Sequence, residues 1–148
     1  RPRRVTSTGQ HSGGLVSYIS TLYDFGGPTV SCQSGAISMK GRMFCHQYEA
    51  YFERATAVHG AATEPAGADP ALGQTTSQVL TVYHADGSVS FPKPPGEEAF
   101  AAELGHAATC VQSGIPSPII GAESARDALA VTCLEAQSVL TGQAVDVP

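Results

Sequence analysis

The hydrophobic pattern of the chain changes at one place, and this change limits the fold more than any other feature. The sequence Pro-Lys-Pro-Pro-Gly at residues 92–96 separates the two patterns. Before it lie runs rich in β-branched and aromatic residues, which are typical of strands. After it, apolar residues recur at the spacing typical of helices. This order indicates an α+β fold: an open-faced, predominantly antiparallel β-sheet with two C-terminal helices packed on one face.

Two hairpins are predicted in the strand-rich part. Residues 15–25 and 29–38 flank Gly26-Gly27-Pro28, and residues 79–84 and 88–92 flank Ala85-Asp86-Gly87. Glycine and Asp-Gly favour tight antiparallel connections because they tolerate positive φ. Asp24, just before the first of these turns, is interpreted as a turn residue rather than a general base.

A further strand is predicted over residues 47–59, which are dense in Tyr, Phe, Thr and Val. Alternation of Tyr51, Glu53 and Ala55 with their neighbours would leave one face of this strand in water. Residues 60–77 are rich in Ala, Gly, Pro and Thr and contain almost no large apolar side chain. We therefore predict a surface loop over residues 60–77.

The helical part contains two amphipathic segments and a short final strand at residues 144–147. The first helix ends at Gly114, has glutamates 97, 98 and 103 in its first turns, and carries the apolar stripe Phe100, Leu104, Ala107 and Val111. The second helix runs from about Glu123 to Thr141 and is followed by Gly142. Its predicted inward residues are Ala125, Ala128, Leu129, Cys133, Ala136 and Leu140.

Composition excludes several classes of partner. A length of 148 residues fits one domain. From Val5 onward thirteen acidic residues face five basic ones, so this part carries a net charge of −8 and does not suit nucleic acid. The sequence contains no membrane-length apolar run and no signal peptide. It starts with Arg1 almost directly on a strand-like stretch. We therefore expect a cytoplasmic domain cut from a longer protein, with no membrane partner.

The four cysteines, Cys32, Cys45, Cys110 and Cys133, form no Cys-x-x-Cys pair. They are interpreted as free thiols in a reducing compartment. Cys45 and His46 are adjacent in the sequence, and adjacent strand residues point to opposite faces, so they cannot activate each other. A small Cys/His hydrolase using Cys45 or Cys32 is therefore the lowest-ranked functional alternative.

Motifs for nucleotide, phosphate or metal binding are missing. No Gly-x-Gly-x-x-Gly, Walker loop or His-Glu-x-x-His is present, and no catalytic residue is assigned. The five histidines are scattered, and none is expected to share a helix face with a second ligand, so no metal site is predicted. His106 is interpreted as a polar residue on the flank of the first helix.

One cationic cluster lies outside the N-terminus. It consists of Lys40, Arg42 and His46. We predict these as substrate-binding residues, forming a patch for an anion or a hydroxyl compound, and the alternative is a solvated strand edge.

Several local sequences resemble the C-terminal domain of the glucose–fructose oxidoreductase / inositol dehydrogenase (Gfo/Idh/MocA) family. Residues 100–114 (Phe-Ala-Ala-Glu-Leu-Gly-His … Gly) are similar to that family's Phe/Tyr-x-x-Glu-Leu-x-His-Phe helix. Residues 120–131 resemble its closing helix, and residues 138–145 its Ser-x-x-Thr-Gly-x-x-Val ending. Upstream, residues 21–27, 51–56 and 80–87 fit its sheet strands and hairpin. The resemblance covers essentially the whole chain.

The resemblance implies a division of labour. In such enzymes an N-terminal Rossmann domain binds NAD or NADP and carries a Glu-Lys-Pro lysine, and an Asp/His motif precedes the first C-terminal strand. The chain starts on that strand, so it has no residue to which those roles transfer. We expect no cofactor in this chain and NAD or NADP in the full-length enzyme.

The predicted function is therefore the substrate-binding and oligomerisation domain of an NAD(P)-dependent oxidoreductase acting on a sugar, polyol or related hydroxyl compound. The domain alone would be catalytically inert, because hydride transfer needs a bound nicotinamide and a proton acceptor. Expected partners are its own Rossmann domain, a sugar-like small molecule and further copies joined through the sheet face. The alternative is a free-standing, non-enzymatic α+β binding or dimerisation module.

Overall fold

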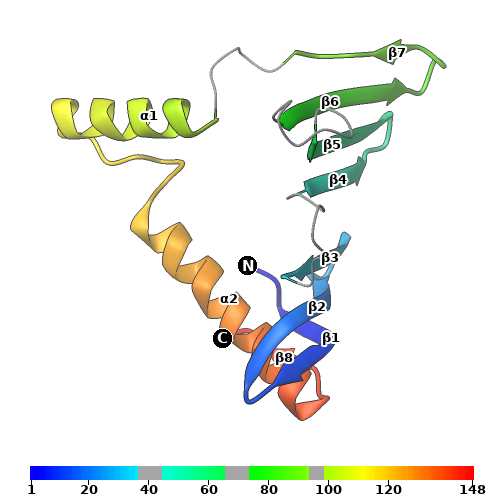
Figure 1. Cartoon of the computed structure of the whole chain (residues 1–148), viewed down its shortest axis with the longest axis vertical. Coiled ribbons are helices and arrows are strands. Elements are labelled where there is room, and N and C mark those ends of the chain that lie inside the picture. Colours follow the sequence, from blue (N-terminus) through cyan, green and yellow to red (C-terminus); the bar gives the residue numbers. More distant parts are fainter. Residues whose placement is uncertain (37–44, 66–73, 94–98) are drawn as a thin grey trace. The chain divides into compact units, whose positions relative to one another are not determined.

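The computed structural model describes residues 1–36, 45–65, 74–93 and 99–148, and side chains are not described at 61–65 and 74–79. The chain forms two compact units (Figure 1). Arg1–Ile37 and Ala99–Pro148 make the first unit, and Ser38–Glu98 make the second. The described elements are α+β with antiparallel pairing, which confirms the predicted fold class. The strands lie in two four-stranded sheets, one per unit.

The first sheet joins the two ends of the chain. It contains β1 (Arg4–Ser12), β2 (Leu15–Asp24), β3 (Thr29–Gly35) and β8 (Val145–Asp146), in the order β3-β2-β1-β8. The β2–β3 hairpin confirms the prediction, with Asp24 opposite Thr29. The Asp24 carboxylate accepts the N–H of Gly26 at 2.7 Å, and Gly26 has a φ of 74°. Asp24 is therefore a turn residue, as predicted.

One helix, α2 (Ala122–Thr141), packs on this sheet, mainly against β1. Strand alternation places Val5 and Ser7 of β1 on one face together with Tyr23 and Thr21 of β2. Val5, Ser7 and Thr21 are buried on this face. The core is small and contains several hydroxyl groups, so hydrogen bonding as well as apolar burial holds α2 on the sheet.

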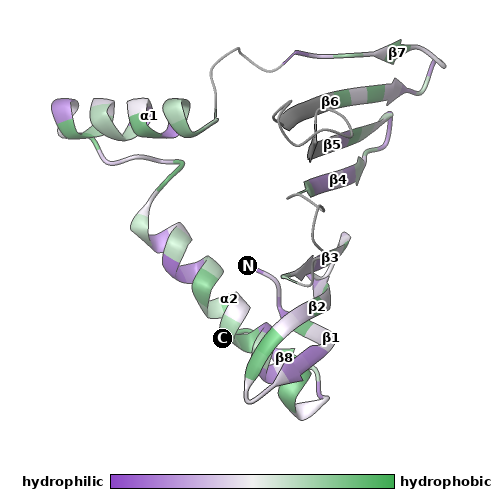
Figure 2. Ribbon diagram, viewed as in Figure 1, coloured by the Kyte–Doolittle hydropathy of each residue, from purple (hydrophilic) through white to green (hydrophobic). Residues whose placement is uncertain are grey.

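The predicted inward face of α2 is wrong. Glu135 and Ser138 are buried, and Asp127, Val131, Leu134, Ala136 and Val139 are partly covered. Of the predicted set, Ala136 alone is partly buried; the exposed members are Ala125, Ala128, Leu129, Cys133 and Leu140. Figure 2 shows hydrophobic residues along α2. Apolar residues lie on two sides of this helix. The side with Ser138 and Glu135 is selected by hydrogen bonds from Ser7 of β1 and Tyr23 of β2.

The first predicted helix is α1 (Ala99–Ser113), followed by Gly114 with φ 67°. It buries none of its side chains: Phe100, Leu104 and Val111 are 72, 71 and 84 % exposed. The predicted apolar stripe therefore exists but is uncovered at all its positions except Ala107, which is half-buried. Packing on a sheet is confirmed for α2 and not for α1. Residues 97 and 98, predicted in its first turn, lie outside the described residues.

The second unit is a sheet of β4 (Cys45–Tyr51), β5 (Ala55–Pro65), β6 (Gln74–His84) and β7 (Val89–Ser90), in that order. The β6–β7 hairpin confirms the Asp-Gly prediction, and Gly87 has a φ of 84°. The single strand predicted at 47–59 is wrong, since residues 52–54 turn the chain between β4 and β5. This turn contains no Gly, Pro or Asn, which is why the pattern did not indicate it.

The loop predicted over residues 60–77 is also wrong within the described residues. Residues 60–65 belong to β5 and residues 74–77 to β6, and the two strands pair from Ala55–His84 to Pro65–Gln74. Residues 66–73 lie outside the described part. A ladder needs backbone N–H and C=O groups rather than large side chains, so small residues such as Ala and Thr can continue it.

Candidate functional site

The predicted substrate-binding cluster is described at one of its three positions. Lys40 and Arg42 lie outside the described residues. His46 lies on β4 of the second unit and is exposed. A role of this cluster in substrate binding stays a prediction.

His46 belongs to a row of three stacked rings on one face of the second sheet. His59 on β5 is the register partner of Tyr48 on β4. His46 lies two residues before Tyr48 and therefore on the same face of the sheet. The His46 and His59 ring centroids lie 5.7 Å apart with planes inclined by 25°. Those of Tyr48 and His59 lie 5.2 Å apart at 14°. His59 is therefore the middle ring of the row.

The middle ring carries an unsatisfied polar atom. His59 Nδ1 is buried and has no hydrogen-bond partner in the described part of the chain. A buried polar atom without a partner costs free energy, and such atoms are rare in folded proteins. Binding of a molecule that offers a hydroxyl or amide group would remove this cost. We therefore treat the row His46, Tyr48 and His59, called the ring row below, as the candidate binding site.

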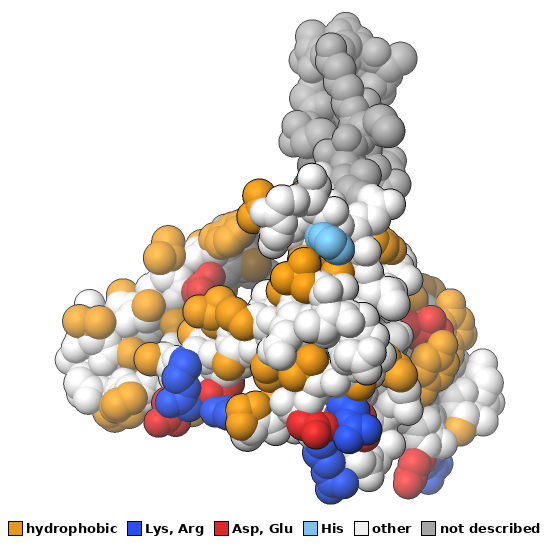
Figure 3. All heavy atoms as spheres, turned by 90° about the horizontal axis from the view of Figure 1, so that it is seen from below, with side chains coloured by type: hydrophobic (Ala, Val, Ile, Leu, Met, Phe, Trp, Pro, Cys, Tyr) orange, Lys and Arg blue, Asp and Glu red, His pale blue; other side chains and the backbone are white. Residues whose placement is uncertain are grey.

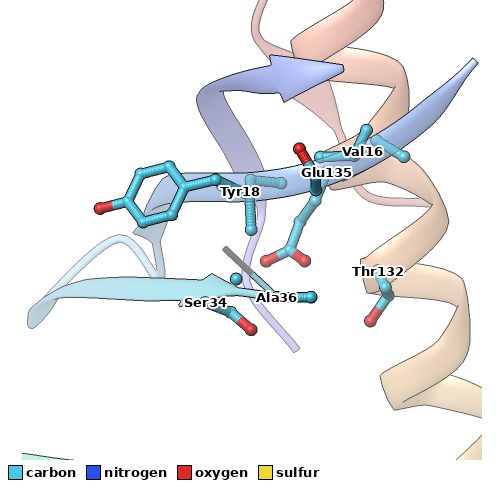
Figure 4. A pocket seen from close by; sticks show the side chains of 10 residues that line it. Val16, Tyr18, Ser34, Ala36, Thr132 and Glu135 are labelled. Carbon is cyan, nitrogen blue, oxygen red and sulfur yellow. The ribbon is translucent and has the colours of Figure 1, made fainter. Parts of the chain in front are cut away.

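A pocket of about 580 Å³ lies in the first unit, between α2 and the strands β2 and β3. Figure 4 shows Thr132 and Glu135 entering it from α2, opposite Ser34 of β3. The Tyr18 ring is turned away from the Glu135 carboxylate. The lining thus combines hydroxyl groups with one carboxylate.

The carboxylate of this pocket is already used by the fold. The Tyr23 hydroxyl of β2 donates a hydrogen bond to Glu135 Oε1. Burial and this hydrogen bond, in that order, raise the pKa of Tyr23 well above its ordinary value of 10.0. Because Tyr23 satisfies Glu135, we assign the pair to the attachment of α2 rather than to ligand binding.

The tail motif at residues 138–145 also has a structural role. Ser138 is fully buried; its Oγ accepts the Ser7 N–H at 2.9 Å and donates to the Gln143 carbonyl oxygen at 2.6 Å. Gly142 closes α2 with a left-handed φ of 67° and donates its N–H to the Ser138 carbonyl oxygen. Val145 then pairs with Val5. The motif therefore turns the chain from α2 into β8.

The structure brings a cysteine and a histidine together on α1. Cys110 Sγ lies 3.6 Å from His106 Nε2, and the Ser117 Oγ lies 2.8 Å from the same nitrogen. The prediction that no histidine shares a helix face with a second ligand is therefore wrong. The signal was present, since residues four apart on a helix are neighbours. His106 is not simply a solvated flank residue.

The remaining sequence predictions concern thiols, metal ions, membrane spans and surface charge. All four cysteines are free thiols. The described residues contain no cluster of three or more His, Cys, Asp or Glu side chains suited to a metal ion. Among the helices described, none has the length and apolarity needed to cross a membrane. Figure 3 shows basic and acidic side chains next to each other on one face. Salt bridges join Arg1 to Asp127 and Arg4 to Asp146.

Comparison with known proteins gives one structural match. No protein-family model and no curated protein matches the sequence. The solved structure of an aldose–aldose oxidoreductase from Caulobacter crescentus, complexed with glycerol, superposes with a TM-score of 0.64 at 19 % identity. The match covers 99 % of this chain and 42 % of that chain. The chain thus has the fold of part of a sugar oxidoreductase and spans less than half of its length.

Proposed function

We propose that the chain is the C-terminal, substrate-binding and oligomerisation domain of an NAD(P)-dependent oxidoreductase of the Gfo/Idh/MocA family. The observation that carries the proposal is the fold match over 99 % of the chain to part of an aldose–aldose oxidoreductase, a member of that family. The motifs at residues 100–114, 120–131 and 138–145 also resemble that family, and this resemblance depends on the sequence alone. The substrate class is a sugar, polyol or related hydroxyl compound, and the compartment is the cytoplasm, which keeps thiols reduced.

The chain alone is proposed to be inert. Hydride transfer requires a nicotinamide held against the substrate and a proton acceptor within hydrogen-bond reach. The sequence contains no dinucleotide-binding glycine motif, so NAD or NADP would be bound by a Rossmann domain of the full-length enzyme. What this chain contributes is a wall of the substrate pocket. Measurable binding of NADH or NADPH to the isolated chain, followed by nicotinamide fluorescence, would contradict this.

Substrate contacts are proposed at the ring row together with Lys40 and Arg42. The unpartnered His59 Nδ1 supports a hydroxyl ligand, because a hydroxyl can act as donor or acceptor toward either tautomer of the ring. The flanking His46 and Tyr48 add polar ring edges on the same sheet face. A flat, polar and aromatic surface of this kind suits a polyhydroxylated molecule with one more apolar side.

The first experiment reads and expresses the coding sequence upstream of Arg1. We expect a strand–Gly-x-Gly-x-x-Gly–helix unit and a later Glu-Lys-Pro. The full-length protein should then change nicotinamide absorbance with aldoses or polyols. A start codon immediately before Arg1 would instead support the free-standing binding module. An upstream Rossmann unit without activity on any hydroxyl compound would refute the substrate class.

The second experiment tests the ring row in the full-length enzyme. His59→Phe keeps a ring in the stack and removes Nδ1, so KM should rise by about tenfold, the loss of about one hydrogen bond to the ligand. His84→Phe is the matched control. His84 lies on the same face of the sheet, about 13 Å further along, and contacts Ser90. Equal KM values for the two variants would remove the ring row from the site.

Association is proposed through the uncovered face of the first sheet. Arg4 and Asp24 form the charged end of this face. Beyond them the face carries uncharged side chains: Thr6, Thr8, Ser20, Leu22, Ser31 and Gln33. Two such faces can meet without like-charge repulsion. Leu22→Glu should shift the chain toward monomers in light scattering, whereas Leu129→Glu on α2 should not. A clean monomer for the unmodified chain at high concentration would refute this part.

A further inference from the structure

We propose that β3 (Thr29–Gly35) pairs with the β3 strand of a second copy of this chain, antiparallel and around a two-fold axis at Cys32. The contact uses the outer edge of the first sheet. It does not depend on the proposed oxidoreductase function, and it is separate from the association proposed through the face of the same sheet.

The backbone of β3 points alternately toward β2 and away from the sheet. Ala36 donates its N–H to the Ser17 carbonyl oxygen at 2.9 Å and so continues the β2–β3 ladder. Because hydrogen bonding alternates along an antiparallel strand, Val30, Cys32 and Ser34 also direct their N–H and C=O groups toward β2. The N–H and C=O groups of the other four residues point outward. We call these groups the β3 edge, and they belong to Thr29, Ser31, Gln33 and Gly35.

The β3 edge has no backbone partner among the described residues. β3 stands at one end of the strand order β3-β2-β1-β8, and all seven of its residues are exposed. The helix α2 packs mainly on β1, two strands away. The Gln33 carbonyl oxygen lies 3.9 Å from the Cys32 thiol, which is only a weak donor. The outward groups therefore form a template on which a further strand can pair.

The other edges of the two described sheets are short or charged. β7 and β8 are two residues long, and β4 carries Glu49. β3 is seven residues long, contains no charged residue and no proline, and pairs with β2 without a register shift. Short strands, charges, prolines and bulges are the features that keep an edge from pairing with another chain. Of the described edges, β3 is therefore the one best suited to accept a strand.

A second β3 strand satisfies the whole edge when the two Cys32 residues lie opposite each other. Ser31 of each copy then lies opposite Gln33 of the other, and Thr29 opposite Gly35, all as hydrogen-bonded pairs. A shift by two residues would leave one end of each edge unpaired. Neither strand is charged, so the copies approach without repulsion. Each edge is used once, so the product is a closed dimer in which two four-stranded sheets become one.

Cys32 reports on this register directly. The two Cys32 residues form a non-hydrogen-bonded pair, in which the Cα atoms lie about 4.5 Å apart. A disulfide joins residues whose Cα atoms are about 4.4–6.8 Å apart. Cys32 is a free and exposed thiol, so mild oxidation should link two copies at this position.

The experiment oxidises the full chain with diamide, which takes up the two protons and two electrons that a pair of thiols gives up. Remaining thiols are alkylated, and peptide mass spectrometry identifies each disulfide. Cys133 is also exposed and serves as the reference. Paired edges hold two thiols at an effective concentration in the millimolar range, so at about 0.1 mM chain the Cys32–Cys32 disulfide should form about tenfold faster than the Cys133–Cys133 disulfide. Equal rates would overturn the proposal and leave the edge to a different protein.

Two further cysteine variants test the register. One combines Cys32→Ser with Val30→Cys, and the other combines Cys32→Ser with Ser34→Cys. The proposed pairing places residue 30 of one copy opposite residue 34 of the other, so a mixture of the two variants should form the mixed disulfide. Each variant alone should not link at the new position, since like positions are then about 14 Å apart along the strands. Links within each variant and none in the mixture would overturn the proposed register.

Substitutions of Gln33 separate the backbone of the edge from its side chains. Gln33→Pro removes an outward N–H and leaves the ladder to β2, because this N–H does not point toward β2. The Cys32–Cys32 disulfide should fall to the Cys133 rate in Gln33→Pro and persist in Gln33→Ala, and circular dichroism checks that both variants fold. An unchanged rate in Gln33→Pro would overturn the proposal. Leu22→Glu, on the sheet face, should keep the Cys32 link, and its loss would assign the contact to the face instead of the edge.

Discussion

Removal of the Ser138 hydroxyl should destabilise the first unit more than any other loss of a single oxygen in α2. Ser138 has 0 % exposure, and its Oγ accepts the N–H of Ser7. Ser7 lies two residues beyond Val5, so its N–H points to the same edge of β1 that pairs with β8. β8 pairs with Arg4 and Val5 and does not extend to Ser7. Ser138 is therefore the group that accepts the Ser7 N–H.

The expected cost of Ser138→Ala follows from these contacts. The buried Ser7 N–H loses its partner, which costs about 1–3 kcal/mol. Alanine recovers about 0.5 kcal/mol because it favours the helix more than serine does. The Gln143 carbonyl, on an exposed residue, can be hydrated instead. The net expectation is a loss of about 2 kcal/mol in the free energy of unfolding of the first unit.

Hydrogen exchange of the β1 amides is the appropriate measurement, because two units need not unfold in one transition. Ser124→Ala is the matched control, since Ser124 is exposed on α2 and undergoes the same change in helix propensity. The Ser7 amide should lose protection in Ser138→Ala and keep it in Ser124→Ala. A difference below about 0.5 kcal/mol between the variants would refute the assigned role of Ser138.

Three further predictions test other parts of the fold. Gly142→Ala forces a left-handed φ on alanine and should lower the free energy of unfolding by about 1 kcal/mol, measured by urea unfolding. An unchanged urea midpoint would contradict this. Tyr23→Phe removes the hydrogen bond to Glu135. Because the pKa of Tyr23 is raised in the folded state, the contribution of Tyr23 to the free energy of unfolding is complete below pH 10.0 and declines above it. The stability difference between the variant and the unmodified chain should therefore shrink in alkaline solution. Leu129→Ala should change thermal stability little, since Leu129 is 65 % exposed. Leu134→Ala, on the covered face of α2, should lower thermal stability. Equal effects of the two substitutions would contradict the orientation of this helix.

The local elements could be predicted wherever the chain carries a strong local signal. The two hairpins follow from glycine-containing turns, and Gly26 and Gly87 have the positive φ values that those turns require. Both helices end at a glycine, as expected. The turn at residues 52–54 and the strands within residues 60–77 carry no such signal, because pairing there depends on the partner strand.

The candidate sites were accessible to sequence reasoning to different degrees. His106 and Cys110 are four residues apart, so their proximity could have been predicted once the helix was recognised. The ring row could not, because the match between His59 and Tyr48 depends on the register of β4 and β5. The burial of Glu135 likewise depends on Tyr23, a residue 112 positions away in sequence.

The sequence by itself determined that the strands of both sheets, apart from β8, precede the helices, and it determined the two glycine-containing hairpin turns and the helix ends. Those features depend on the backbone preferences of a few neighbouring residues. It also determined the absence of a nucleotide-binding motif, which is a property of residue spacing. Tertiary structure decided which face of α2 is buried. Both of its sides carry apolar residues, and the buried hydrogen bond between Ser7 and Ser138 selects one of them. Hydrophobic periodicity measures how apolar a face is, and it contains no information about which distant amide needs a partner.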